Sequence, residues 1–176
     1  MNTALFYGIV LALTNIVLAL VGFFLGFQTD KLAEGQWFGW LNLVAMVGIT
    51  WLGIRAVREE AADKSLSYGR GVLTGFVISV CSGVIGAVYT FIHFQFINPS
   101  YADYYLDFLR QKWAEKGLGD AQVAAAEKFT RFLMSPGIMS VVGLITTVVF
   151  GVVVALILAA ILKRAPGRVA PPTDAV

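Results

Sequence analysis

The fold of this chain is decided by residues 71–98, which read GVLTGFVISVCSGVIGAVYTFIHFQFIN and stop at Pro99. A small residue recurs at every fourth position of this stretch, at Gly71, Gly75, Ser79, Gly83 and Ala87. Residues four apart lie on one face of an α-helix, and small side chains on such a face let another backbone approach closely. The stretch therefore predicts a long helix with a smooth packing face.

Length and composition place this helix in a bilayer. Of 176 residues, 58% are hydrophobic and 14% are charged, whereas a soluble domain has about 25% charged residues. The charges are clustered and leave four apolar windows, each with the roughly 20 residues that cross a bilayer. The first window lacks the basic start of a signal peptide, so we expect it to be retained. We predict an all-α, four-span transmembrane helix bundle in contact with the lipid bilayer, with spans at about residues 4–27, 37–57, 70–97 and 136–163.

The fourth span carries a second stripe of small residues, at Gly143, Thr147, Gly151 and Ala155. Two such stripes in one small chain favour close packing of the third span on the fourth. Glycine is frequent in membrane helices whatever their packing, so the stripes alone do not decide the matter. They also leave open whether the packing joins spans of one chain or of two copies in a homo-oligomer.

Residues 99–135 separate the third and fourth spans. Pro99 cannot continue the third helix, and an amphipathic segment then runs from about residue 101 to 116. Glycines end it, a second short helix follows over about 121–134, and Ser135-Pro136 is a typical start for the last span. We predict a short extramembrane two-helix insertion within a single domain, residues 1–163, and a flexible tail over residues 164–176.

The orientation in the membrane follows from lysine and arginine, which favour the cytoplasmic side. They gather in the loop between the second and third spans, and again after the fourth. We therefore expect both termini in the cytoplasm and the insertion 99–135 outside. The basic residues concerned are Arg55, Arg58, Lys64, Arg70, Lys163, Arg164 and Arg168.

Side chains that could carry chemistry are scarce. The four apolar windows, the last of which ends at Leu162, contain no Asp, Glu or Lys, and the chain has no metalloprotease, serine-hydrolase or phosphate-binding motif. Ionisable residues inside spans usually mark membrane enzymes and proton carriers. We therefore expect no enzymatic activity, no catalytic residue, no cofactor and no metal site. The net charge of +2 lies in the loops, so we expect no nucleic-acid partner.

The single histidine, His93, lies near the outer end of the third span. It could serve as a haem or metal ligand, for which one chain offers no second histidine, or as a hydrogen-bonding residue at the membrane interface. We favour the second interpretation. Polar and aromatic residues are densest around it, so any binding site should include a cluster formed by His93, Gln95, Asn98, Tyr101 and Tyr104.

Residues 91–105, FIHFQFINPSYADYY, follow a glycine-rich span. Together with Tyr68-Gly-Arg-Gly71 at the start of that span, they resemble the DUF4199 family of uncharacterised bacterial membrane proteins. The resemblance extends in layout over most of the chain. It implies a bacterial inner membrane, and it implies no activity.

Two classes of function fit these observations. The first is a non-enzymatic accessory or scaffold subunit, which acts by helix packing and meets a membrane-complex partner through its insertion. The alternative is a small oligomeric channel or transporter. A passive pore would be lined by the small polar residues of the spans, Asn15, Thr50, Ser79, Ser82 and Thr147. A membrane enzyme ranks third.

Overall fold

A computed structural model of the chain describes residues 2–165. Within these residues the fold is helical. The described part contains no β-strand and one isolated β-bridge, so the predicted all-α class is confirmed. The elements are α1 (Thr3–Phe24), a 3₁₀ turn η1 (Glu34–Phe38), α2 (Gly39–Glu59), α3 (Tyr68–Ile92), a π-helical turn η2 (His93–Ile97), α4 (Tyr101–Glu115), α5 (Asp120–Leu133) and α6 (Pro136–Leu162). From residue 166 on, the predicted flexible tail lies outside the described residues.

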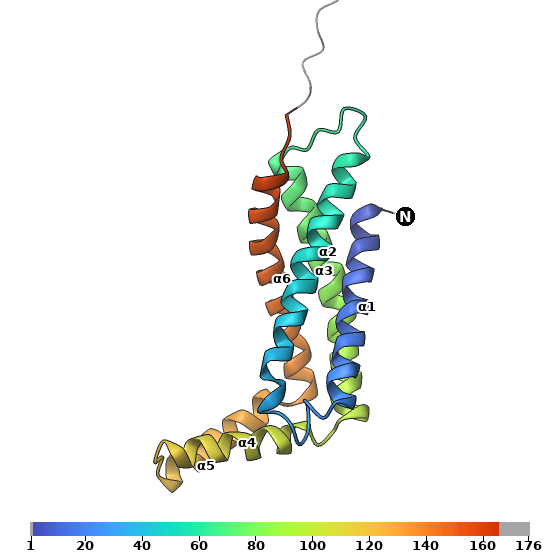
Figure 1. The fold of residues 1–176 in the computed structure, drawn as a ribbon. Helices are drawn as coiled ribbons and strands as arrows, with labels where there is room; N and C mark the ends of the chain where they lie inside the picture. Colours follow the sequence, from blue (N-terminus) through green and yellow to red (C-terminus); the bar gives the residue numbers. More distant parts are fainter. Residues whose placement is uncertain (1, 166–176) are drawn as a thin grey trace, which may run out of the picture.

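Among residues 2–165, four helices are long and apolar enough to cross a membrane. They are α1, η1 with α2, α3 with η2, and α6, so the expected multi-pass membrane protein is confirmed. Figure 1 shows these helices side by side as a bundle. The two short helices α4 and α5, which we call the arm, cross one end of the bundle and extend to one side of it (Figure 1).

The ends of the spans follow local chemistry. The side chain of Asn2 accepts a hydrogen bond from the backbone N–H of Ala4 (2.9 Å), and that of Ser67 accepts one from Arg70 (3.3 Å). Each serine or asparagine thereby satisfies a donor that has no partner inside its helix. Pro136 occupies the first turn of α6, where its missing N–H costs nothing.

The seam between α3 and α6 is the most extensive contact between elements. A Cβ added to Gly71 would lie 2.9 Å from the Cβ of Ala159, and one added to Gly75 would overlap that of Ala155. A Cβ on Gly151 would overlap the side chain of Ser79. The two backbones therefore approach as closely as the small residues permit, and they do so within one chain.

A hydrophobic cluster closes the end of the bundle opposite the arm. It consists of Ile54 and Val57 from α2, Leu66 from the following loop, and Leu158 and Leu162 from α6. Beside it, Leu66 exchanges two backbone hydrogen bonds with Arg164, each 3.0 Å long. The second residue after α6 is thus held against the loop that precedes α3.

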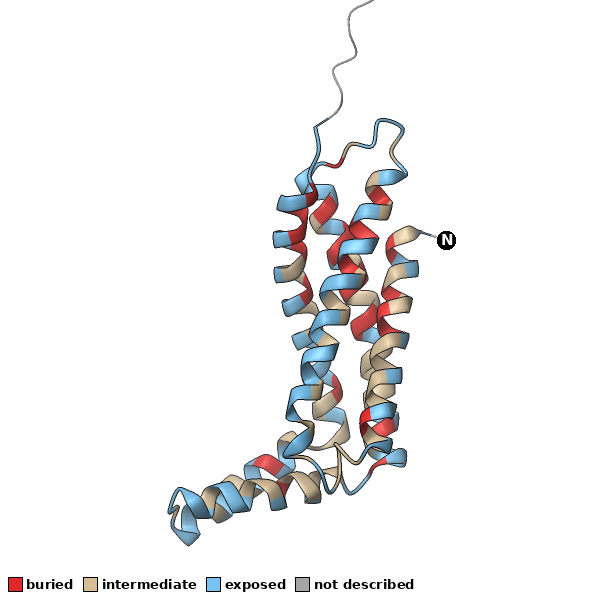
Figure 2. Ribbon diagram, viewed as in Figure 1, coloured by how far each residue is buried: buried red, intermediate tan, exposed pale blue. Residues whose placement is uncertain are grey.

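Burial is distributed unevenly along the bundle (Figure 2). The buried residues of α2 begin at Thr50, and those of α6, apart from Ser140, begin at Gly151. We call the well-buried part of the bundle the closed half. It comprises residues 50–59 of α2, residues 151–162 of α6, and the turns of α1 and α3 that face them. The part nearer the arm, with residues 39–49 of α2 and 136–150 of α6, is the open half.

Candidate functional site

A polar junction lies where the third span meets the arm, and His93 is at its centre. The residue is 1% exposed, so the neighbouring segments enclose its imidazole ring. Its Nε2 is 2.8 Å from Oε1 of Gln28, and its Nδ1 is 2.9 Å from the hydroxyl of Tyr89. Because an amide oxygen can only accept, Nε2–H donates to Gln28 and Nδ1 accepts from Tyr89. The neutral ring therefore has no free nitrogen.

Gln28, in the loop after α1, joins three segments at this junction. Besides contacting His93, its Nε2 donates to the carbonyl of Ala19 (2.9 Å), and its own carbonyl accepts from Nδ2 of Asn98 (3.2 Å). The sequence prediction missed Gln28. The one signal that could have found it is its position: it follows the first span at the end of the bundle where His93 ends the third.

The π-helical turn η2 brings His93 and Asn98 to the same junction. The N–H of Asn98 donates to the carbonyl of His93, five residues back, over 2.7 Å. Pro99 disfavours helical dihedrals at the residue before it, and Asn98 has left the helix, with φ −130° and ψ 66°. π-Helical turns of this kind frequently occur at functional sites.

The structure divides the predicted cluster of five residues. His93 and Asn98 are buried together, whereas Gln95 is exposed and Tyr104 is half-buried. Tyr101 lies beside Phe94, with ring centroids 4.6 Å apart, and stacks on Tyr105 at 6.0 Å. Burial, with a smaller contribution from Tyr105, raises the pKa of Tyr101 to about 12. Tyr101 therefore connects the arm to the span through aromatic contacts, without a charge.

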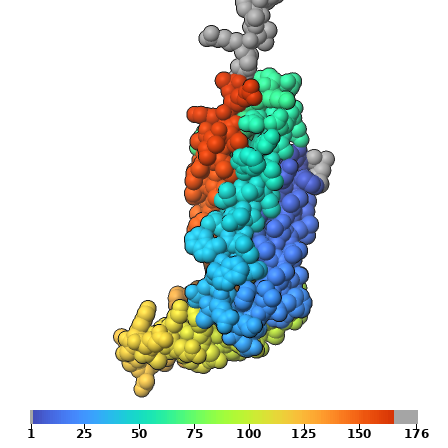
Figure 3. Space-filling view, viewed as in Figure 1, coloured from blue at the N-terminus to red at the C-terminus, as the bar shows by residue number. Residues whose placement is uncertain are grey.

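A cavity of about 610 Å³ lies next to this junction, in the open half. All four spans contribute to its wall, from Ala12 on α1 to Phe150 on α6. In the space-filling view, α2 lies in front of the bundle between α1 and α6 (Figure 3). Within the wall there is no charged side chain. Its polar side chains are Asn15, Gln28, Gln36, Asn42, Ser82, Tyr89, Thr90, His93, Thr146 and Thr147.

The two predicted small-residue stripes meet in the closed half and separate in the open half. A Cβ on Gly83 would lie 2.8 Å from Cδ1 of Leu144, so the seam at this point packs against a large side chain. Beyond it, a Cβ on Gly143 would meet no atom within 4 Å. Gly143, Ala87 and Thr147 all line the cavity.

Two ion pairs join the two helices of the arm, and a third lies within α4. Nε of Arg110 donates to Glu127 (2.6 Å) and its NH1 group donates to Asp107 (2.8 Å), while Arg131 lies 2.9 Å from Asp103. The hydrogen bond from Arg110, and then the charges of Arg110 and Arg131, hold the pKa of Glu127 below its usual value. Two large rings on α5, Phe129 and Phe132, remain 63% and 60% exposed.

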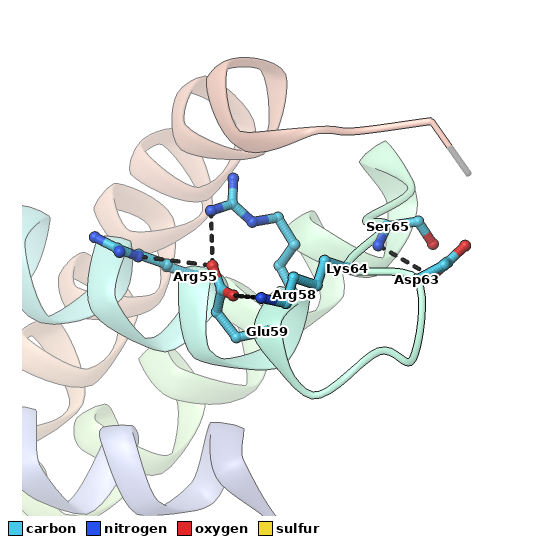
Figure 4. A network of polar contacts seen from close by, with 6 residues as sticks. All are labelled: Arg55, Arg58, Glu59, Asp63, Lys64 and Ser65. Carbon is cyan, nitrogen blue, oxygen red and sulfur yellow. Dashed lines mark hydrogen bonds and ion pairs between the residues drawn. The ribbon is translucent and has the colours of Figure 1, made fainter. Parts of the chain in front are cut away.

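The opposite end of the bundle carries a solvated charge network (Figure 4). Glu59 lies 3.1 Å from Arg58, 3.7 Å from Lys64 and 3.9 Å from Arg55. The backbone N–H of Ser65 donates to Asp63 (3.1 Å), and hydrogen bonds from Ser65 lower the pKa of that carboxyl. These contacts end the second span and order the loop that follows it.

Comparison with known proteins shows the family to which the chain belongs. A family model described as "Protein of unknown function (DUF4199)" matches residues 6–164. The chain belongs to this family. The resemblance carried by residues 91–105 is thereby confirmed, and the DUF4199 match extends over the four spans and the arm. No curated protein and no solved structure matches the chain. In the described part of the chain, no three His, Cys, Asp or Glu side chains lie together as a metal site would require.

Proposed function

We propose that this DUF4199 protein is a non-enzymatic accessory or scaffold subunit of a membrane complex, and that its arm is the element that contacts the partner. The observation that supports this proposal is the pair of exposed rings on α5, Phe129 and Phe132. Residues three apart lie on one helix face, so both rings are available to the same surface. Large exposed aromatic side chains are typical anchors of protein interfaces.

The partner best suited to this face is another integral membrane protein with an apolar surface just outside the bilayer. The arm crosses the end of the bundle and extends beyond it (Figure 1), so it can reach a neighbour in the same membrane. Its ion pairs, from Arg110 to Glu127 and from Arg131 to Asp103, fix the two helices relative to each other. A preformed surface loses less conformational entropy on binding than a flexible one.

An accessory role also agrees with the chemistry of the spans. Both nitrogens of His93 are engaged in hydrogen bonds, so the ring offers no free base or ligand. We propose, accordingly, that the protein acts without an enzymatic step and without a cofactor.

We also propose the bacterial inner membrane as its location, with both termini cytoplasmic and the arm outside. Labelling of an Ala124→Cys variant by a membrane-impermeant maleimide, in a Cys81→Ser background, tests that orientation; protection in intact cells would reverse it.

The alternative, an oligomeric channel or transporter, receives less support from the geometry. Of the five small polar residues expected in a pore, Asn15, Ser82 and Thr147 line the cavity. Thr50 and Ser79 are buried in the closed half, where Ser79 donates to the carbonyl of Gly75 (2.8 Å). Within one chain, close packing in the closed half therefore separates these two residues from the three that line the cavity. Ion flux into liposomes containing only this protein would favour the channel instead.

The arm proposal is tested by photo-crosslinking in native membranes. Benzoylphenylalanine in place of Phe129 should crosslink to one defined protein, and native mass spectrometry should find that protein in complex with the unmodified chain. The double variant Phe129→Ser/Phe132→Ser should lose the complex. The control Ala124→Ser/Ala125→Ser, also exposed on α5, should keep it.

Two results would overturn this function. The first is crosslinking from position 129 to lipid alone, because the rings would then rest in the headgroup region. The second is a complex that survives the loss of both rings, since the partner would then bind elsewhere.

A further inference from the structure

We propose that the cavity in the open half binds a neutral amphiphile, namely a long-chain alcohol whose hydroxyl group contacts Asn15 and whose tail occupies the apolar wall. This inference goes beyond the accessory role, which concerns the arm. The cavity of about 610 Å³ falls within the range of small-molecule sites, roughly 300–1,000 Å³.

The wall determines the charge of the ligand. It contains no Asp, Glu, Lys or Arg, and both nitrogens of His93 are engaged in hydrogen bonds. A phosphate or carboxylate head group would be desolvated here without a counter-charge, which strongly disfavours binding. An uncharged head group avoids this cost. Apolar residues such as Ile16, Leu43 and Met46 provide a surface for a hydrocarbon tail.

Asn15 determines the kind of head group. It lies in the middle of α1 and in the cavity wall, and its Oδ1 is buried without a hydrogen-bond partner. Buried polar atoms are rarely left unpaired. A half-turn about the Cβ–Cγ bond, which is a soft torsion for asparagine, exchanges the oxygen and the nitrogen. A hydroxyl group both donates and accepts, so it can pair with whichever end of the carboxamide faces the cavity.

The side of the cavity gives the ligand a way in from the bilayer. Between residues 39 and 49 no residue of α2 is buried, and the same holds for residues 141–150 of α6. The cavity wall includes exposed residues of both segments, Trp40 and Leu43 on α2 and Gly143 and Phe150 on α6. In the closed half, by contrast, α2 and α6 meet in the cluster around Ile54 and Leu158. A tail can therefore pass between the two helices only on the arm side.

The test uses purified full-length protein in neutral detergent and hexadecanol with a diazirine in its tail. Photolabelling should map to cavity-wall peptides of α3 and α6, and unlabelled hexadecanol should compete for it. Hexadecyl phosphate, which has the same tail and an anionic head, should compete poorly. Asn15→Leu should lower labelling about fivefold, as expected for the loss of one hydrogen bond.

Glycine variants provide the matched controls. Gly143→Leu adds a side chain where a Cβ meets no atom within 4 Å, and it should fill the cavity and abolish labelling. Gly48→Leu makes the same change at an equally open position outside the wall, and it should leave labelling intact. If Gly143→Leu fails to fold, Gly86→Leu fills the cavity from α3, where a Cβ also has open space.

Equal labelling of the Gly48 variant and the cavity-filling variant would overturn the proposal, because the probe would then report only the lipid-facing surface. Equal competition by hexadecyl phosphate would overturn the neutral head group. Either result would leave the arm proposal intact, since Phe129 and Phe132 do not line the cavity.

Discussion

The closed and open halves of the bundle are built from the same four helices, yet they pack in opposite ways. At Gly75 and Gly151 an added Cβ would overlap the facing helix, whereas at Gly86 and Gly143 it would meet no atom within 4 Å. The change occurs at Gly83, which faces the large side chain of Leu144. A small residue therefore permits close approach only where the residue opposite is small as well.

This difference suggests a division of roles along the bundle axis. The closed half, with its seam and the cluster around Ile54, provides stability. The open half gives up contacts and keeps a cavity bounded by the polar junction at His93. Regions with few buried contacts are those that proteins use for binding and movement.

The comparison is tested most strongly by adding a side chain to each half. Gly75→Leu forces the seam apart, and overpacking of this kind costs about 1–3 kcal/mol. Gly143→Leu should change the free energy of unfolding by less than about 0.5 kcal/mol, as a substitution into open space does. The free energy of unfolding of each variant is measured by circular dichroism during unfolding by SDS in mixed micelles. Equal losses would show that the two halves are packed alike.

The polar junction, which closes off the open half, is tested by Gln28→Ala. This change leaves the buried Nε2–H of His93 without its acceptor and removes the bond to Ala19. Loss of a partner from a buried polar group costs about 1–3 kcal/mol. Hydrogen–deuterium exchange should accelerate over residues 93–98. Gln36→Ala, at an exposed position in the same connection, should leave that exchange unchanged; acceleration in both variants would count against a specific role for Gln28.

The smallest effect is expected in the arm, beyond the open half. The pKa of Glu127 in the folded arm lies below its ordinary value of 4.5. A carboxylate with a lowered pKa stabilises the fold above its ordinary pKa, and this contribution is lost as the pH falls through the folded value. The protection factors of the amides in α4 and α5, which correct for the pH dependence of intrinsic exchange, should therefore fall below about pH 4.5, while those of the seam stay high.

In a Glu127→Gln variant this loss of protection on acidification should be weaker, because the titrating group is gone. Glu115→Gln, which changes an exposed carboxyl at the end of α4, should behave like the unmodified chain. Identical pH profiles for the Glu127 variant and the unmodified chain would mean that the pair with Arg110 does not hold the arm together.

The fold class could be predicted from the sequence because it depends on properties that a linear pattern carries. Four apolar windows, a proline after each of Asn98 and Ser135, and clustered charges are sufficient for four spans and an insertion. The packing of α3 against α6 could also be predicted from such a pattern, because Gly71 and Gly75 have the same four-residue spacing as Ala155 and Ala159.

The site could be predicted only in part. The position of Gln28 places it at the same end of the bundle as His93, but no local pattern indicates that its side chain reaches a histidine 65 residues further along the chain. Gly143 and Gly151 look equivalent in the sequence, but one lines a cavity and the other is packed against Ser79. Such distinctions depend on how far two helices diverge. That divergence depends on facing pairs such as Gly83 and Leu144, which no local pattern contains.

The seam between α3 and α6 also has a consequence for the synthesis of the protein. The whole arm separates the two helices in the chain, so α3 is translated completely before its partner begins. Until the residues of α6 have been translated, Gly71 and Gly75 lack the alanines on which they pack, and the Leu66 backbone lacks the two bonds it later shares with Arg164. The bundle is therefore completed from its last helix, and the arm tethers the two halves of the seam until they meet.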